Sequence, residues 1–140
     1  MTTADPTIPP RLESIIFCSN IKRDPSGRLT FENVFHAIEA KQRKSAPGEP
    51  PVAQLRFWFC AVWVKGVGRF DLRLEMAPPD GIRQVLGNAG FTLPTPTYVA
   101  PLYGGLNVEF TQPGPHEFVI LLNGQEAYRK VMQVSILPRR

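Results

Sequence analysis

A β-hairpin is predicted over residues 113–136, PGPHEFVILLNGQEAYRKVMQVSI. The apolar run Phe118–Leu122 meets Asn123-Gly124, and a second run of alternating apolar residues follows. Both central residues of a type I′ turn need a positive φ, which Asn tolerates and Gly adopts freely. A regular register would leave apolar side chains on both faces of this hairpin. We therefore expect either a bulge near Lys130 that exchanges the faces or a cover on both sides.

In the rest of the chain, turn residues also separate short apolar runs. Pro and Gly contribute 15 and 11 of the 140 residues, and they cluster between the runs without a period. About eight short segments have strand character, and none has a convincing helical pattern. These features predict an all-β fold, a single antiparallel β-sandwich or barrel that spans residues 1–140. Of the two, we expect the sandwich, and the family resemblance described below implies that it is of immunoglobulin-like type. Residues 1–10 are predicted to form an extended lead-in, and residues 39–52 a long exposed loop.

The most hydrophobic segment is residues 55–65, LRFWFCAVWVK. Its odd-numbered and even-numbered positions are both apolar, so Trp58 and Trp63 are expected on opposite faces. Such a strand is either central and covered on both sides, or packed on the core with one face and on a subunit with the other. The clean alternation of residues 69–76 predicts a half-exposed strand, and the short glycine turn between the two segments predicts that they pair as a hairpin.

Reactive residues are few. Cys18 and Cys60 lie within apolar runs, and His36 and His116 lie near predicted strand ends. A Cys–His nucleophile pair is conceivable, but buried core cysteines and strand-end histidines are the commoner arrangement. The cysteine and histidine spacings match no metal motif, and the glycine turns do not lead into a helix that could hold a phosphate. We expect no enzymatic activity, no cofactor and no metal.

A binding surface is the one functional role that the residues favour. Five aromatic residues could line a sugar-binding or peptide-binding face, although core packing is the commoner use of such residues: Trp58, Trp63, Tyr98, Tyr103 and Tyr128. A short basic run adds Lys41, Arg43 and Lys44 as candidates for contact with nucleic acid or an acidic partner, although so short a run is more commonly part of a solvated loop. The net charge is +4, with no long basic stripe and no interleaved aromatic residues, which disfavours nucleic acid as a partner.

The location is expected to be cytoplasmic. The first ten residues, MTTADPTIPP, lack the basic and apolar regions of a secretory signal, and no apolar stretch approaches the length of a membrane span. We therefore expect the two thiols to be reduced. A Cys18–Cys60 disulfide is the alternative for an exported protein.

Two segments resemble a family of small bacterial all-β proteins known as a domain of unknown function. The first is RLESIIFCSNIKRDPSGRLTFENVF, residues 11–35, and the second is FTQPGPHEFVILLNGQEAYRKVMQVSI, residues 110–136. In that family an aromatic residue is usual where His116 stands, and Asp where Asn123 stands. The resemblance implies an immunoglobulin-like or C2-like β-sandwich from a bacterial cytosol, and it implies no activity.

Three functions are weighed against these observations. The first is a non-catalytic module that binds an unknown protein partner or assembles with itself. The second is a module that binds a carbohydrate or another small ligand through exposed aromatic residues. The third, an enzyme that uses Cys/His chemistry, needs Cys18 or Cys60 within reach of His36 or His116.

Overall fold

The structure is a computed structural model that describes residues 7–43, 47–49 and 52–138. These residues form strands and connecting turns, with no helix among them. The nine strands are β1 (Arg11–Arg23), β2 (Leu29–Val34), β3 (Ile38–Gln42), β4 (Ala53–Val64), β5 (Gly68–Ala77), β6 (Gln84–Leu93), β7 (Ala100–Phe110), β8 (Gly114–Leu122) and β9 (Gln125–Leu137). The predicted all-β class is confirmed.

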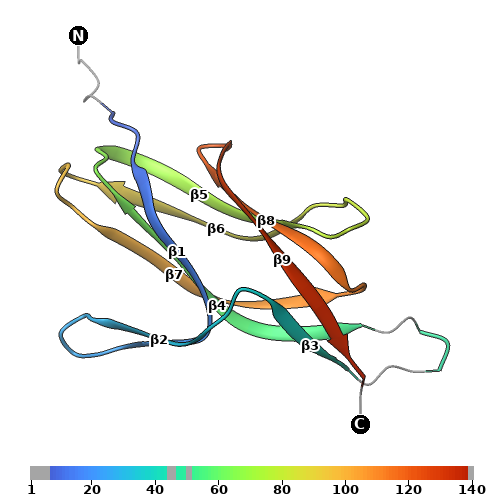
Figure 1. The fold of residues 1–140 in the computed structure, drawn as a ribbon. Coiled ribbons are helices and arrows are strands. Elements are labelled where there is room, and N and C mark those ends of the chain that lie inside the picture. Colours follow the sequence, from blue (N-terminus) through green and yellow to red (C-terminus); the bar gives the residue numbers. More distant parts are fainter. Residues whose placement is uncertain (1–6, 44–46, 50–51, 139–140) are drawn as a thin grey trace.

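The nine strands belong to one curled, open sheet (Figure 1). Its path runs β2-β1-β4-β3-β9-β8-β5-β6, and β7 pairs with the other edge of β4. We call β2, β1, β4 and β7 the β4 half, and β9, β8, β5 and β6 the β8 half. The short strand β3 joins them, since it pairs antiparallel with β4 and parallel with β9. The expectation of a purely antiparallel sheet is therefore wrong at the β3–β9 pair.

The two halves face each other across one apolar core. Phe17 of β1 and Phe57 of β4 meet Phe118 of β8, with ring centroids 5.4 Å and 6.4 Å from the Phe118 ring. Near the other end of β4, Trp63 stacks on Phe91 of β6 at 5.8 Å. Offset and edge-on aromatic pairs add to the free energy gained by burying the rings. The core is thus held by aromatic contacts between strands that share no hydrogen bonds.

The closing hairpin is confirmed as β8–β9. Asn123 and Gly124 have φ values of 50° and 81°, as a type I′ turn requires. The bulge lies at Ala127 rather than near Lys130, because Leu121 pairs with Glu126 while Ile120 pairs with Tyr128. The extra residue changes the parity of β9. Ile120 consequently joins Met132 in the core.

Two other expectations need correction. Residues 39–42 of the predicted loop 39–52 are not a loop but belong to strand β3, whose Ile38 and Ala40 are 1% and 0% exposed. The segments 55–65 and 69–76 do not pair as a hairpin. Strand β4 pairs with β1, β3 and β7, whereas β5 pairs with β6 and β8. The link at Gly66 carries the chain across the core from one half to the other.

The N-terminal segment is fastened to this link. Ile8 and Val67 exchange two backbone hydrogen bonds of 2.9 and 3.0 Å, and Pro10 packs against Gly66. A Cβ atom at Gly66 would lie 2.7 Å from Pro10 Cβ and 2.9 Å from the Ile8 carbonyl oxygen. Such distances are too short for real Cβ contacts, so the segment would have to move.

We expect Gly66→Ala to lower the free energy of unfolding by about 1–3 kcal/mol, measured by urea denaturation. Gly104→Ala is the matched control, because a Cβ there meets no atom within 4 Å. The control should stay within about 0.5 kcal/mol of the wild type. Equal losses from the two variants would show that the segment does not rest on Gly66.

Candidate interaction surface

Strand β4 has one face on the core and another on the outside of the molecule. Phe57, Phe59, Ala61 and Trp63 lie in the main core, whereas Trp58, Cys60 and Val62 belong to a separate apolar cluster with Cys18. The predicted separation of Trp58 and Trp63 is therefore confirmed. The odd-numbered side chains hold the fold together, and the even-numbered ones cover the opposite side of the β4 half.

This second cluster is only partly covered. Three of its partly buried members, Ile16, Trp58 and Val62, share a face with Val34 and Tyr103, and we call these five residues the outer patch. Cys18 pairs with Trp58 and Val34, and Cys60 pairs with Ile16 and Tyr103, so these side chains share a face. Val34 is 50% exposed and Tyr103 is 38% exposed. Two candidates from the sequence, Trp58 and Tyr103, thus meet on one apolar surface.

The two cysteines form the floor of the outer patch. Both are free and fully buried, and they are diagonal neighbours across the β1–β4 pair. Burial raises the pKa of the Cys60 thiol to about 11, and the neighbouring Cys18 adds to the rise. Burial also raises the pKa of Cys18. Both thiols are therefore protonated at neutral pH, and protonated thiols are poor nucleophiles.

The Cys60 thiol should make stability depend on alkaline pH. A pKa that is higher in the folded chain gives a contribution that is complete below the ordinary value of 9.0 and disappears as the pH rises through about 11. Between pH 8 and pH 10.5 we expect the wild type to lose about 2 kcal/mol more than Cys60→Ala does. Urea unfolding at pH 8 and pH 10.5 measures the difference. Parallel losses in the two proteins would contradict the buried-thiol assignment.

The histidines lie elsewhere. His116 is 1% exposed, its Nδ1 is 3.0 Å from the Gly114 carbonyl oxygen, and its ring lies edge-on to Phe110 in the main core. His36 is 2.8 Å from Lys130 Nζ, through its Nδ1 atom. The cysteines occupy the other side of the β4 half, so the fold does not assemble the Cys–His pair that the sequence left open.

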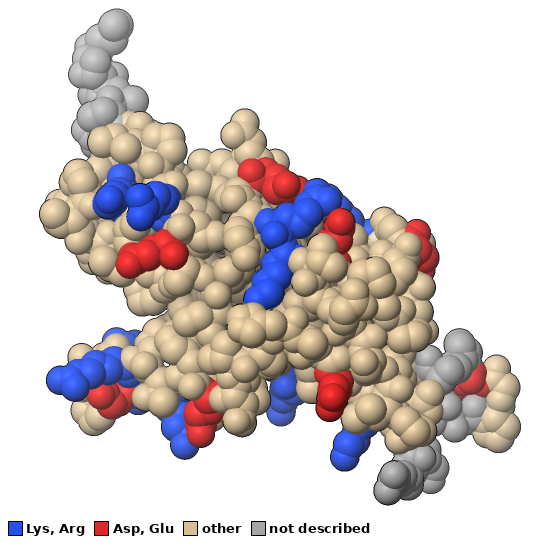
Figure 2. Space-filling model, viewed as in Figure 1, with Lys and Arg blue, Asp and Glu red and all other residues tan. Residues whose placement is uncertain are grey.

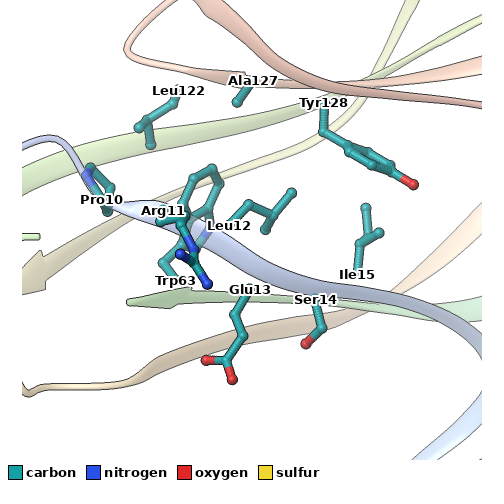
Figure 3. A pocket seen from close by; sticks show the side chains of 10 residues that line it. All are labelled: Pro10, Arg11, Leu12, Glu13, Ser14, Ile15, Trp63, Leu122, Ala127 and Tyr128. Carbon is teal, nitrogen blue, oxygen red and sulfur yellow. The ribbon is translucent and has the colours of Figure 1, made fainter. Parts of the chain in front are cut away.

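A groove lies between β1 and the β8–β9 hairpin (Figure 3). It has a volume of about 600 Å³ and is lined by Pro10–Ile15, Trp63, Leu122, Ala127 and Tyr128. In Figure 3, Leu12 and Trp63 lie between the two walls, while Glu13 and Ser14 point away from the hairpin. The volume falls within the range of ligand-binding pockets, about 300–1,000 Å³. Two more sequence candidates, Trp63 and Tyr128, therefore meet at a concave site.

Trp63 combines a buried ring with an unpaired ring nitrogen. It is 1% exposed, and its Nε1 atom is the buried side-chain nitrogen that lacks a hydrogen-bond partner within the described part of the chain. A buried donor without an acceptor costs about 1–3 kcal/mol. The indole is held by the stack on Phe91, so it does not turn freely to find an acceptor.

The basic candidates line neither the groove nor the outer patch. Lys41 and Arg43 lie at and just after the end of β3, and the Arg43 guanidinium is paired with Glu109 at 2.7 Å. Lys44 lies outside the described residues. Tyr98, 48% exposed, lies in the loop before β7.

The outer side of the β8 half has a different character. Ion pairs follow one another there: Arg129 with Glu117 at 2.9 Å and with Glu126, and Glu75 with Arg73 and Arg83. On the face shown in Figure 2, basic and acidic side chains lie beside one another rather than in patches of one sign. The exposed pairs of Arg129 contribute little to stability and keep the surface hydrated.

The sequence gives no sign of the groove and an incomplete view of the outer patch. Parity places Trp58 and Trp63 on opposite faces, but Leu12, Leu122 and Ala127 carry no signal of a groove. They meet only because the bulge at Ala127 and the separation of β1 from β9 leave space there. The sequence also carries no sign that Val34 belongs to the outer patch, since only the pairing with Cys18 places it there.

Among the described residues, no group of three His, Cys, Asp or Glu side chains is arranged to hold a metal ion. The same part of the chain contains no helix that is long and apolar enough to cross a membrane.

Comparisons with known proteins give little. The chain matches no protein-family model and no curated protein. A solved structure that it resembles is that of Pseudomonas fluorescens alkylpurine DNA glycosylase AlkC bound to DNA containing an abasic site analog, with 14% identity and a TM-score of 0.37. The match covers 57% of this chain and 25% of that chain. At this TM-score the likeness supports no statement about the function of the present chain.

Proposed function

We propose that this chain is a non-catalytic interaction module that self-associates through the outer patch. The observation that supports the proposal is the two-sided apolar character of β4. Its core face is complete without the outer patch, yet Trp58 and Val62 on the other face remain only partly covered. Apolar side chains gathered on one face are typical of protein contact surfaces, and aromatic residues are enriched among those that dominate binding energy.

A second copy is the occupant that best fits this face. Two pairs of opposite charges flank the patch, Lys22 with Glu32 at 3.5 Å and Arg43 with Glu109 at 2.7 Å. A two-fold interface brings the same surface of each copy together, so the surface must complement itself. Apolar side chains flanked by both charge signs meet this requirement, because each positive group finds a negative one on the other copy.

The proposal includes a finer description of the fold and its setting. The β4 half and the β8 half are the two layers of an immunoglobulin-like sandwich, with β3 passing between them. The facing aromatic residues Phe17 and Phe118 support this description. A cytoplasmic location is supported by Cys18 and Cys60, which are neighbours that remain unpaired.

The test replaces Tyr103 with arginine. We expect Tyr103→Arg to weaken self-association at least tenfold, because the change places a hydrated charge in the apolar interface. Sedimentation equilibrium at concentrations up to about 200 μM, which populate a dimer of micromolar Kd, measures the change.

The matched control is Val131→Arg. Val131 is 51% exposed and lies opposite Glu117, on the outer side of the β8 half. This variant should associate like the wild type. A wild type that stays monomeric over the whole concentration range would refute the proposal, and so would an equal loss from the two variants.

A further inference from the structure

The groove beside Trp63 lies at a position of the sheet that no described strand occupies. At one end of the molecule β3 fills the space between β4 and β9, with Lys41 opposite Gln54 and Ile38 opposite Val134. Further along, β1 takes the edge of β4 through the pairs Arg11–Val64 to Cys18–Trp58. Within the described residues, no strand pairs with the other edge of β1 before Cys18, or with the outer edge of β9 before Val134.

The backbone of β1 offers hydrogen bonds at this open edge. The Phe17 carbonyl oxygen accepts a hydrogen bond of 3.0 Å from Phe35 N, so the polar groups of Phe17 point away from β4. In an antiparallel pair the direction alternates from residue to residue. The N–H and C=O of Ile15 therefore also point away from β4, toward the groove that Ile15 lines.

The groove also has the side chains that a strand would need. Leu12 on β1 and Leu122 on the hairpin are partly buried and pack against the core. Ala127, also on the hairpin, has a small side chain that leaves space in the groove. Trp63 Nε1 adds a buried donor that lacks an acceptor. Arg11 and Glu13 bring one charge of each sign to the same stretch of β1. This combination suits an uncharged, partly apolar chain that contains hydrogen-bond acceptors.

We propose that the β1–β9 groove binds an extended peptide segment of a protein partner, which adds as a strand to the free edge of β1. The peptide backbone pairs with Ile15, and an apolar side chain of the peptide enters the space between Leu12 and Leu122. A carbonyl or hydroxyl oxygen accepts a hydrogen bond from Trp63 Nε1 once a lining side chain such as Leu12 changes its rotamer. This is the strand-addition mode of peptide recognition, in which backbone bonds give affinity and pockets give specificity. The site is separate from the outer patch, so it does not depend on self-association.

A displayed library of random eight-residue peptides tests this site. The library is selected on the full chain and counter-selected on Ala127→Trp, a variant in which an indole fills the groove from an exposed position. We expect sequences to be enriched that bind the wild type at least tenfold more tightly than Ala127→Trp. Trp63→Phe, which keeps the ring but removes the donor, should weaken binding about fivefold, as expected for one hydrogen bond. Thermal unfolding of each variant verifies that it is folded.

Methylation of the peptide backbone separates strand addition from other binding. Methylating alternate peptide nitrogens should abolish binding in one phase of the alternation and leave the other phase nearly unaffected, because every second N–H of an added strand pairs with the sheet edge. The Ile15 amide should gain protection from hydrogen exchange. Failure to enrich any sequence over the counter-selection would overturn the proposal. Binding that is indifferent to methylation in both phases would also overturn it and would indicate a small-ligand pocket.

Discussion

Phe118→Ala is expected to lower the free energy of unfolding by about 3–5 kcal/mol. Phe118 is 1% exposed on β8, and its ring touches the rings of Phe17 and Phe57 on the other half of the sheet. Its removal leaves a cavity between two halves that share no hydrogen bonds at this point. Neither half can close the cavity without shifting the strand pairs that hold its neighbours. Urea denaturation gives the value.

A double-mutant cycle isolates the contact between the halves. Phe17→Ala, Phe118→Ala and the double variant should show a coupling of about 0.5–1.5 kcal/mol for the aromatic pair. Tyr98→Ala is the control, because this side chain is 48% exposed in a loop and should contribute less than about 0.5 kcal/mol. Strict additivity of the two core substitutions would show that the rings do not join the halves.

Ile38→Ala is expected to cost about 2–4 kcal/mol. Ile38 is 1% exposed at the start of β3 and pairs with Val134 of β9. Strand β3 provides the hydrogen-bonded link between the two halves. Loss of its anchoring side chain should therefore loosen the sheet as well as create a cavity. Hydrogen exchange should show faster exchange for the β3 amides and for Val134.

Ile82→Ala is the matched control, since Ile82 is 70% exposed in the loop before β6. It should change the stability by less than about 0.5 kcal/mol. A loss of similar size in both variants would mean that β3 is a surface segment, as the predicted loop over residues 39–52 implies.

The sequence predicts where the strands lie better than it predicts which strands pair with one another. Alternation within residues 69–76 identifies the core face of β5, and Asn123-Gly124 identifies the closing turn. Alternation does not say which strand lies beside which, because a strand presents the same apolar face to a neighbour in its own half or to the opposite half. The incorrect pairing of β4 with β5 follows from this ambiguity.

Strand β3 escapes prediction for a different physical reason. It is five residues long, and its polar side chains Glu39, Lys41 and Gln42 make the segment resemble a loop. Its inward residues are Ile38 and the small Ala40. The partner that stabilises it, β9, lies at the other end of the chain, and parallel pairing over such a separation leaves no local signal.

Of the two candidate surfaces, the sequence predicts the outer face of β4 but not the groove. The two apolar faces of β4 are visible in the sequence, because parity along a strand is local. The groove beside Trp63 is not visible, since it depends on the space between two strands and on the bulge at Ala127. Short motifs report turns and faces, whereas grooves arise from the relative placement of whole strands.

The most direct test of self-association through the outer patch is photo-crosslinking of the purified protein. Benzoylphenylalanine is placed at position 103 in one sample and at position 131 in another, and both samples are irradiated under the conditions of the sedimentation experiment. The outer patch predicts a covalent dimer from position 103 and none from position 131. Irradiated samples that contain no dimer from position 103, or as much dimer from position 131, would contradict it.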